Sequence, residues 1–438
     1  MKTKSFQKDK VSVITLGCSK NKVDSEVLSQ QLQQGGYNVV HDKWTRSRNI
    51  VIINTCGFID KAKEESIQTI MDYAGAKSDG RIEKLYVTGC LSQRYAPELQ
   101  TEIPEVDAWF GTRDLPRLLK TLNVTYRHEL VGERLLSTPS HFAYLKISEG
   151  CNRTCSFCAI PLMRGKHISR PIDELLTEAR KLAAAGVKEL ILIAQELTYY
   201  GLDIYKKRSL GLLLDELQQV EGIEWIRLHY LYPAQFPPDL TDAMLRNPKV
   251  CPYLDMPLQH ASDNVLTAMR RNISRKETET LIHNIRQAIP HIALRTTLLT
   301  GHPGEGPKEF DELADFIQQM RFDRLGVFTY SHEENTRAHT LPDAISEEEK
   351  NERAARLMEI QEQISLELNQ QKIGKSFQTL IDKKEGDYYI GRTIYDSPEV
   401  DNEVLIPASD SSYIRIGDFV NVRIDAAEAF DLYASLIP

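Results

Sequence analysis

The first third of the chain alternates short apolar runs with amphipathic stretches. Each apolar run is followed by one such stretch, at residues 11–16 and 22–34, 49–53 and 61–73, and 85–87 and 94–100. Short apolar runs predict buried strands, and their alternation with helices predicts that these strands run parallel. We therefore expect a parallel α/β domain over residues 1–136.

A second and longer alternation follows a break in this rhythm. Turn-forming residues at 136–140 predict a linker. Six further strands are then expected at residues 142–147, 189–194, 225–231, 253–257, 293–298 and 325–329. Because six strand-helix units are fewer than the eight of a closed β/α barrel, the pattern predicts a partial barrel over residues 137–372.

Two helices of this region carry clear end signals. Pro171 and Gly186 bracket residues 172–185, which we expect to be helical. Ser346 and the glutamate three residues later predict a capping box that opens the last long helix, whose apolar stripe runs to Gly374. A surface helix that closes the flank of the barrel explains this stripe better than a partner-binding helix.

The pattern changes to short β-rich pieces after residue 374. Apolar and β-branched runs predict four strands, at residues 377–381, 388–395, 403–406 and 419–424, with turn residues at Gly386, Pro398, Asp410 and Gly417. Several short strands at this spacing predict a small antiparallel, OB-like β-barrel over residues 373–438.

Composition and charge narrow the class of protein. The 438 residues are 41% hydrophobic and 26% charged, as in folded soluble proteins. The net charge of −8 gives no overall basic footprint for nucleic acid or an anionic membrane. From Lys375 onward, six basic and twelve acidic residues give a net charge of −6, which disfavours nucleic acid as a partner of the tail. A polar N-terminus at residues 1–10 and the lack of a long apolar run predict a cytoplasmic location.

Three closely spaced cysteines, Cys151, Cys155 and Cys158, directly follow a predicted strand. Three thiolates in one loop can hold a 4Fe-4S cluster by three of its irons and leave the fourth iron open to substrate. A structural zinc site has four protein ligands, so a zinc loop that borrows a distant histidine is the less favoured interpretation, as is a chance grouping.

Three other cysteines, Cys18, Cys56 and Cys90, are far apart in sequence, but each follows a predicted parallel strand by two or three residues. The carboxyl ends of parallel strands share one edge, so these cysteines can converge on one site, where a second cluster would fit. By position alone, three buried core cysteines are equally compatible with the pattern.

The neighbours of these cysteines favour a site over a core. Polar side chains flank the first two of them: Asn21 and Asp24 after Cys18, and Asn54 and Thr55 before Cys56. A hydrophobic core would exclude such groups, whereas the surroundings of a cluster can use them. Cys251 has no such neighbours and is expected to be inert.

The cysteine-bearing segments closely resemble the signatures of the methylthiotransferase branch of the radical S-adenosylmethionine (SAM) enzymes. The matching runs are LGCSKNKVDSE at 16–26, NTCGFID at 54–60, VTGC at 87–90 and KISEGCNRTCSFCAIP at 146–161. Arg164-Gly165 and Ser169-Arg-Pro171 resemble the branch that acts on a ribosomal protein. The resemblance covers nearly the whole chain and implies an N-terminal methylthiotransferase domain, a radical SAM barrel and a C-terminal TRAM domain.

This resemblance implies two 4Fe-4S clusters and SAM as cofactors. Cys151, Cys155 and Cys158 would bind the cluster whose open iron chelates SAM, and the other three cysteines, Cys18, Cys56 and Cys90, would bind an auxiliary cluster. It also implies that SAM is lined by residues near the ends of later strands: Gln195, Glu196, Arg295, Gly301 and Glu305. No catalytic side chain is implied beyond the cluster ligands.

Three further positions relate to this resemblance. His260 belongs to a motif at residues 259–263, but a hydrogen-bonded structural histidine explains it better than catalysis. His302 stands where the family usually has phenylalanine, and Asn335 stands where glycine is usual. Because asparagine tolerates the left-handed backbone, we expect the turn at Asn335 to survive.

The implied reaction replaces an unactivated C–H bond by C–S–CH3. Such a bond needs a cofactor radical, because no side chain abstracts hydrogen strongly enough. An electron from a low-potential donor would cleave SAM to a 5′-deoxyadenosyl radical, while a second SAM would methylate sulfur held at the auxiliary cluster. In the ribosomal-protein branch the acceptor is the β-carbon of an aspartate in small-subunit ribosomal protein S12.

Two alternatives remain open at this point. The sister branch modifies an adenosine in tRNA, which the acidic tail disfavours, and we expect neither stable nucleic acid binding nor membrane association. A non-catalytic iron-sulfur scaffold or electron carrier would explain the cysteines, but not a six-stranded barrel with cofactor-like loops.

Overall fold

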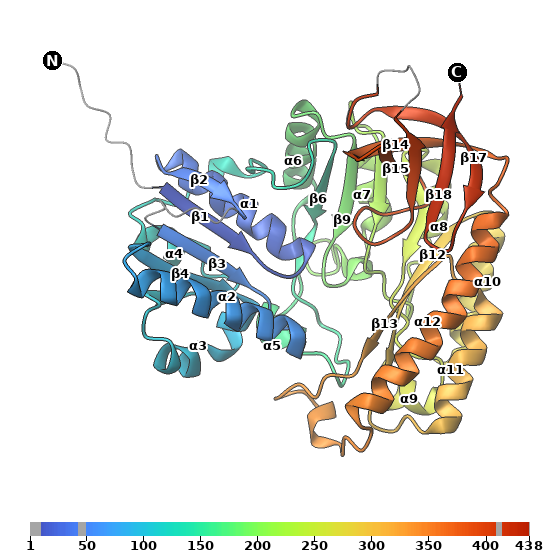
Figure 1. Ribbon diagram of the computed structural model, residues 1–438, viewed down its shortest axis with the longest axis horizontal. Coiled ribbons are helices and arrows are strands. Elements are labelled where there is room, and N and C mark those ends of the chain that lie inside the picture. Colours follow the sequence, from blue (N-terminus) through green and yellow to red (C-terminus); the bar gives the residue numbers. More distant parts are fainter. Residues whose placement is uncertain (1–9, 43–49, 409–413, 438) are drawn as a thin grey trace.

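Three domains follow one another along the chain in the computed structural model, which describes residues 10–42, 50–408 and 414–437. Figure 1 shows the N-terminal domain in blue beside the central β/α domain in green and yellow, with the C-terminal barrel in red at one end of the central domain. The polar residues 1–9, the strand start at Asn49 and the turn at Asp410 lie outside the described residues.

The N-terminal domain is a five-stranded sheet in the order β2-β1-β3-β4-β5, with every pair parallel. Its strands are β1 (Lys10–Thr15), β2 (Asn38–His41), β3 (Ile50–Thr55), β4 (Lys84–Gly89) and β5 (Ala108–Trp109), and its helices are α1 (Ser19–Gln34), α2 (Asp60–Ser78), α3 (Cys90–Glu102) and α4 (Leu115–Thr121), with a 3-10 turn at His128–Leu130. The predicted parallel α/β domain is confirmed.

Two short edge strands, β2 and β5, were not predicted. Their four and two residues are too few for a periodic signal, and pairing with β1 and β4 creates them. The strand order reverses between β1 and β3, which makes the carboxyl end of this pair a topological switch point.

The central domain is an open, parallel six-stranded sheet in the order β13-β12-β11-β10-β9-β6. Its strands are β6 (Phe142–Lys146), β9 (Glu189–Ile193), β10 (Trp225–Leu228), β11 (Val250–Asp255), β12 (Ala293–Thr300) and β13 (Arg324–Thr329), and a small hairpin pairs β7 (Ser148–Glu149) with β8 (Ile168–Ser169). The six strands confirm the predicted partial barrel.

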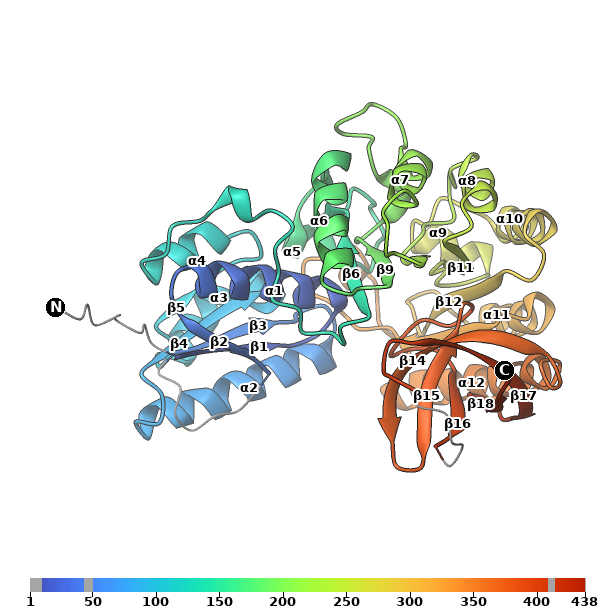
Figure 2. The same ribbon diagram turned by 90° about the horizontal axis from the view of Figure 1, so that it is seen from above.

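Helices cover the outer side of this curved sheet, as Figure 2 shows from above. They are α6 (Ile172–Ala184), α7 (Leu210–Leu217), α8 (Leu240–Arg246), α10 (Arg275–Ala288) and α11 (Pro307–Met320); shorter α5 (Ile160–Arg164), α9 (Asp263–Ala268) and 3-10 turns at Leu197–Tyr199 and Ala338–Thr340 lie in the loops. The last helix, α12 (Glu347–Gln370), packs against β13 and α11, as expected for a helix that closes the flank.

Only half of the predicted capping box forms at the start of α12. The Ser346 hydroxyl accepts a hydrogen bond from the Glu349 backbone N–H at 3.2 Å. The Glu349 carboxylate instead forms an ion pair with Arg353 one turn further along, so a charge-charge contact takes the place of the reciprocal bond.

The C-terminal domain is a closed barrel in the order β14-β15-β16-β18-β17. Its strands are β14 (Ser376–Glu385), β15 (Tyr388–Thr393), β16 (Glu403–Pro407), β17 (Phe419–Ala427) and β18 (Asp431–Leu436). The sequence pattern missed β18, whose pairing with both β16 and β17 closes the barrel. The β16–β18 pair is parallel, while the other pairs are antiparallel.

The C-terminal barrel caps the amino-terminal end of the central strands. Leu380 of β14 is buried against Trp225 at the start of β10 and Cys251 of β11, and Phe419 meets Trp225 with a ring-centroid distance of 4.9 Å. Cys251 is thus an apolar packing residue between two domains, in line with the expectation that it is inert.

A buried ion triplet lies inside this apolar contact. Glu189, the first residue of β9, accepts a hydrogen bond from Arg227 Nε at 2.8 Å and forms an ion pair with Arg392 of β15. Burial opposes ionisation of Glu189, but the charges of Arg392 and Arg227 hold the pKa of its carboxyl below the usual value. The central barrel and the cap therefore share one compensated set of buried charges.

The segment at 136–140 is docked rather than free. The backbone N–H and hydroxyl of Ser137 both donate to Glu26 of α1, at 2.8 and 2.7 Å, and Leu136 packs against the core of the central domain. The predicted linker therefore fixes the N-terminal domain to the barrel. None of the helices in the described ranges combines the length and apolar character needed to cross a membrane.

We expect Glu189→Gln to lower the free energy of unfolding by about 3–5 kcal/mol, because it removes the paired carboxylate of buried Arg227 and leaves Arg392 with Asp382 alone. Urea denaturation measures this change. The control is Asp215→Asn, which breaks an exposed ion pair with Arg246 and should cost less than about 1 kcal/mol. Equal losses in the two variants would contradict the assignment of the triplet.

Candidate functional site

The N-terminal cysteines gather at the carboxyl edge of the first sheet. Cys18 precedes the first turn of α1, Cys56 immediately follows β3, and Cys90 is the first residue of α3. Two of the three therefore lie at helix N-termini, where the helix dipole favours a thiolate. The predicted convergence follows from the parallel sheet, and each of the three is close enough to the others to shift a thiol pKa within the set.

Glycines permit this close approach. A Cβ atom on Gly17, whose φ is +86°, would lie 2.6 Å from the Cys56 Cβ and 2.9 Å from its Sγ. A Cβ on Gly89, whose φ is +103°, would lie 2.4 Å from the Thr55 carbonyl oxygen. The chain before Cys18 and before Cys90 can therefore press against the β3 loop only because neither glycine has a side chain.

The guanidinium of Arg164 lies close enough to these thiols to offset part of their negative charge as thiolates. Burial raises the pKa of Cys56, and burial together with the other two thiolates raises the pKa of Cys90 to about 12, against the lowering effect of Arg164. Three thiolates at one point, with Cys56 and Cys90 buried and Cys18 partly buried, repel one another, and metal coordination removes that penalty. The donor set fits an iron-sulfur cluster.

The polar neighbours hold the cysteine loops in place. The Asn21 side-chain amide donates to the Leu16 carbonyl at 2.7 Å and to the Thr55 carbonyl at 3.1 Å, so it joins the Cys18 loop to the Cys56 loop. Asn54 donates to the Asn21 carbonyl at 3.0 Å, and the Thr55 hydroxyl donates to the Thr88 carbonyl at 2.7 Å.

The barrel cysteines occupy the loop between β7 and α5. Gly150, with φ +80°, lets this loop leave β7, because a Cβ there would lie 2.2 Å from the Lys166 carbonyl oxygen. The Cys151 N–H donates to the Gly165 carbonyl at 3.1 Å, and the Ser156 N–H donates to the Met269 carbonyl at 3.0 Å. Backbone bonds thus fix both ends of the loop.

Cations and hydrogen-bond donors surround the sulfur atoms of this loop. Arg271 donates to the Cys155 Sγ at 3.5 Å, and the Tyr232 hydroxyl lies 3.8 Å from the same sulfur. Burial raises the pKa of Cys151 to about 11 and also raises that of Cys158, and the neighbouring thiolates add to both shifts. These three thiols also fit a cluster.

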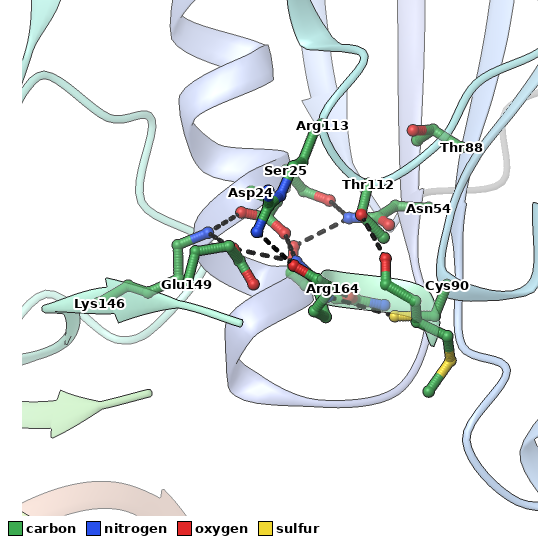
Figure 3. Close-up of polar contacts among 12 residues, drawn as sticks. Asp24, Ser25, Asn54, Thr88, Cys90, Thr112, Arg113, Lys146, Glu149 and Arg164 are labelled. Carbon is green, nitrogen blue, oxygen red and sulfur yellow. Dashed lines mark hydrogen bonds and ion pairs between the residues drawn. The ribbon is translucent and has the colours of Figure 1, made fainter. Parts of the chain in front are cut away.

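A charged network surrounds Arg164 beside Cys90 (Figure 3). Arg164 of α5 donates to the Cys90 Sγ at 3.3 Å and to Asp24 at 2.6 Å, and Lys146 of β6 pairs with Asp24 and with Glu149 of β7. The network therefore joins the N-terminal sheet to the loop that bears the barrel cysteines. Burial opposes ionisation of Glu149, but Lys146 and Arg164 lower the pKa of its carboxyl to about 2.

The predicted cofactor residues Gln195 and Glu196 lie beside the barrel cysteines. The Gln195 amide donates to Glu149 at 2.7 Å, while its buried Oε1 has no partner among the residues that the structure describes. Glu196 accepts hydrogen bonds from Arg153, at 3.2 and 3.1 Å, and from Thr198. Arg153 lies between two of the cysteines in sequence, so Glu196 positions the cysteine loop by binding Arg153. The Oε1 atom of Gln195 is able to accept a further hydrogen bond.

Gly301 and Glu305 form a tight turn after β12. The Glu305 carboxylate is buried and accepts from the Gly301 N–H at 3.0 Å, from Arg353 at 2.6 Å and from the Thr300 hydroxyl at 2.9 Å. His260 meets its second oxygen at 3.0 Å, and the other ring nitrogen of His260 accepts from the Ser262 N–H. Partners within the chain engage both Glu305 and His260, which is the structural role expected for His260.

Arg295 lies in the interior of the central barrel, toward the C-terminal cap. It is the third residue of β12, and its guanidinium forms ion pairs with Asp255 at 3.0 Å and with Asp401 of the cap at 3.3 Å. Both partners of Arg295 are therefore protein carboxylates, and the cysteine loop is not among them. The ion pair with Asp401 also joins Arg295 to the C-terminal domain, and its contact with the cofactor stays a prediction.

The two departures from the family pattern are accommodated in different ways. His302 is fully buried between the rings of Phe157 and Tyr330, so it fills an aromatic position. Its Nδ1 meets the Pro303 carbonyl at 2.8 Å and its Nε2 meets the Ser156 hydroxyl at 3.3 Å, which fits a neutral imidazole. Asn335 has φ +62°, which confirms the left-handed turn.

The sequence did not show the roles of several site residues, although Lys146, Glu149 and Arg153 belong to the quoted run at 146–161. Arg153, Arg271, Tyr232, Lys146 and Glu149 act through contacts that only the folded chain creates. Among the described residues, no three His, Cys, Asp or Glu side chains are placed to hold a single metal ion. A cluster differs from such an ion because each thiolate binds a separate iron.

A cavity of about 300 Å³ adjoins the network at the carboxyl edge of the N-terminal sheet. Its wall includes Asn54 and Thr88 at the ends of β3 and β4, Thr112 after β5, and Lys146. The cavity occupies the crevice where open parallel sheets bind ligands.

Family models match each of the three domains. Residues 10–111 match the uncharacterized protein family UPF0004, residues 145–317 the radical SAM superfamily, and residues 373–437 the TRAM domain. The chain is 58% identical over 437 residues to the ribosomal protein uS12 methylthiotransferase RimO of Cytophaga hutchinsonii, with 100% of both chains covered. It is 51% identical to the RimO of Bacteroides thetaiotaomicron, with 99% of both chains covered.

Solved structures share the fold at low identity. The radical SAM methyltransferase TsrM from Kitasatospora setae, with cobalamin and a [4Fe-4S] cluster bound, matches with a TM-score of 0.55 and 15% identity, over 73% of this chain and 75% of that one. The cobalamin-dependent radical SAM enzyme OxsB matches with a TM-score of 0.51 and 12% identity, over 80% of this chain and 56% of that one.

Protonation of His302 should reduce stability in mild acid. Burial lowers its pKa to about 4, so between pH 6.5 and pH 4 the unfolded chain binds a proton that the folded chain does not. Stability therefore falls as the pH drops through this window. We expect His302→Phe to remove about 2 kcal/mol of the loss between pH 7 and pH 5, measured by urea denaturation of the cluster-free chain.

The control for this experiment is His283→Phe, which replaces an exposed histidine of α10. This variant loses one histidine, as His302→Phe does, but at an exposed position, so a matching change in both variants would contradict the role of the buried site. Parallel stability curves for the wild type and His302→Phe would show that the buried imidazole does not contribute.

Proposed function

Because this chain belongs to the RimO family of ribosomal protein uS12 methylthiotransferases, we propose that its two cysteine sets divide the reaction between two clusters. The chain is a radical SAM enzyme that transfers a methylthio group to ribosomal protein uS12, and it uses an iron-sulfur cluster and SAM. The observation that carries the proposal is that one charged network joins the segments that bear two sets of three cysteines, all of them buried or partly buried.

Cys151, Cys155 and Cys158 hold the cluster that engages SAM in this proposal. Three thiolates leave one iron of a 4Fe-4S cluster without a protein ligand, and this iron can bind the amino and carboxylate groups of SAM. When bound, the cluster supplies the electron that cleaves SAM to the species that abstracts hydrogen. The chain keeps the loop rigid through its backbone bonds to Gly165 and Met269.

Cys18, Cys56 and Cys90 hold the second, auxiliary cluster in this proposal. Their burial and their mutual repulsion as thiolates favour a cationic centre at this point. The second cluster explains why one chain carries two separate sets, because a single-cluster enzyme has no use for the N-terminal thiols. It would hold the sulfur that becomes the methylthio group.

In this proposal SAM is lined by Gln195, Glu196, Arg295, Gly301 and Glu305, and Gln195 offers it a direct hydrogen bond. The buried Oε1 of Gln195 lacks a partner beside the Cys151 loop, which is the condition for accepting a hydrogen bond from a ligand amino group. Glu196 accepts a hydrogen bond from Arg153 of the cysteine loop. The hydrogen bond from the Gly301 N–H to Glu305 fixes the turn that contains His302, and His302 contacts Ser156 of the same loop.

The acceptor atom in this proposal is the β-carbon of an aspartate in protein uS12, the electron source is a low-potential donor, and the setting is the cytoplasm. The net charge of −8 supports a basic polypeptide as the partner, without stable nucleic acid binding.

Mass spectrometry tests the proposal: anaerobically reconstituted chain, reductant and SAM are offered to uS12 and to tRNA in parallel. A methylthio gain on tRNA alone would overturn it.

We expect Cys18→Ala and Cys155→Ala each to abolish methylthio transfer to uS12, but for different reasons. Cys18→Ala should lose about half of the bound iron and keep SAM cleavage, whereas Cys155→Ala should lose both SAM cleavage and the other half. Iron analysis and detection of 5′-deoxyadenosine separate the two.

Cys251→Ala is the matched control, because this cysteine is buried in an apolar layer away from both sets. It should keep full iron content and transfer. Retention of all iron in Cys18→Ala would refute the auxiliary cluster.

We expect Gln195→Ala to weaken SAM binding about tenfold, since one hydrogen bond to a charged group is worth about 1.5–3 kcal/mol. Isothermal titration of the reconstituted chain measures the affinity, and iron content should stay at the wild-type level. The control Gln219→Ala changes an exposed glutamine after α7 and should leave the affinity unchanged. Equal affinities in all three chains would exclude Gln195 from the SAM site.

A further inference from the structure

One guanidinium group reaches all three N-terminal cysteine loops. Arg164 is the last residue of α5 and is 3% exposed. Its Nε donates to the Cys90 Sγ at 3.3 Å, and one terminal nitrogen donates to the Asn21 side-chain oxygen. Asn21 in turn bonds the Leu16 and Thr55 carbonyls, which adjoin the loops of Cys18 and Cys56.

Acids from both domains hold Arg164 in this position. Its second terminal nitrogen donates to Asp24 of α1 at 2.6 Å and to Glu149 of β7 at 3.3 Å, and Glu149 also accepts from Gln195. Four acceptors in different directions use the planar fork of a guanidinium, which the single ammonium of lysine does not reproduce. The side chain therefore has one defined placement (Figure 3).

Arg164 also belongs to the segment that carries the barrel cysteines. It follows Cys158 by six residues, and the carbonyl of the next residue, Gly165, accepts from the Cys151 N–H at 3.1 Å. One short stretch of chain thus supplies three thiols to one cysteine set and a cation to the other. Any shift of the barrel loop moves this cation relative to Cys90.

We propose that Arg164 is a positioning residue that docks the barrel loop onto the auxiliary cluster and raises the reduction potential of that cluster through its bond to the Cys90 sulfur. The inference rests on the proposed function, because it requires a cluster on Cys18, Cys56 and Cys90. Reduction adds negative charge to a cluster, and an N–H donor on a ligand sulfur stabilises that charge, most strongly in a buried site.

The barrel set offers an internal comparison. Arg271 donates to the Cys155 Sγ at 3.5 Å and to the Pro257 carbonyl, and it makes no contact with the N-terminal cysteines. Each set therefore has one guanidinium on one ligand sulfur. Replacing either arginine removes the same charge and the same kind of N–H···S bond from a different cluster.

The experiment measures each cluster alone in the full-length chain. Cys151→Ala, Cys155→Ala and Cys158→Ala together leave only the N-terminal set, and the reciprocal triple replacement leaves only the barrel set. Arg164→Met, Arg164→Lys and Arg271→Met are added to each background. Iron per chain reports loading, and redox titration followed by electron paramagnetic resonance reports the midpoint potential.

Arg164→Met is first measured in the background that keeps the N-terminal set. At a fixed applied potential it should lower the ratio of reduced to oxidised cluster at least tenfold, which corresponds to a fall of about 59 mV in the midpoint potential of a one-electron couple. Arg164→Lys keeps the charge and should shift the ratio less. Arg271→Met should leave this cluster unchanged and lower the potential only in the reciprocal background.

The outcomes separate this inference from the proposal on which it rests. Absence of iron from the parent background with the N-terminal set intact would refute the auxiliary cluster, and the inference with it. Normal loading with an unchanged potential in both Arg164 variants would overturn the role of Arg164 alone. Failure of Arg164→Met to load, with loading and a lowered potential in Arg164→Lys, would support both docking and tuning.

Discussion

The structure depends on the geometry of parallel sheets, which places the carboxyl ends of neighbouring strands at one edge. In the N-terminal domain this edge collects three cysteines that are tens of residues apart, and in the central domain it presents a loop with three more. Cys56 and Cys90 are buried and the other four cysteines of these sets are partly buried, so charged groups at the meeting of the two edges offset the burial of the thiols. Arg164 donates to the Cys90 sulfur, and Lys146 pairs with the acids beside it.

The meeting of the two edges also explains the acids around them. Asp24, Glu149 and Glu196 neutralise the cations that face the sulfur atoms, so the site holds a compensated set of charges rather than a cationic pocket. Such a set is stable only when every member is in place, because removing one leaves another buried without a partner. The chemistry and the docking of the domains therefore depend on the same side chains.

The C-terminal barrel shows how a charge count can mislead about a surface. Its net charge of −6 argues from sequence for an acidic exterior, but several of its acids face the central domain. Asp396 pairs with Arg324, Asp401 with Arg295, and Glu399 with Lys22 of α1. Asp396 and Asp401 thus fasten the cap to the central domain, whereas Glu399 fastens it to the N-terminal domain at a lysine four residues after Cys18.

The sequence alone determined the succession of domains, the parallel sheets and both sets of cysteines, because hydrophobic period, strand-end position and local spacing are properties of short segments. It could not supply β18, which pairing across the barrel creates, or the half-formed capping box at Ser346, which Arg353 disrupts. It also gave no sign of the ion pair that joins Arg295 of the central domain to Asp401 of the C-terminal domain. Only the tertiary structure decided which cation meets which sulfur, because Arg164 and Cys90 are separated by 74 positions and no local pattern records a contact over that distance.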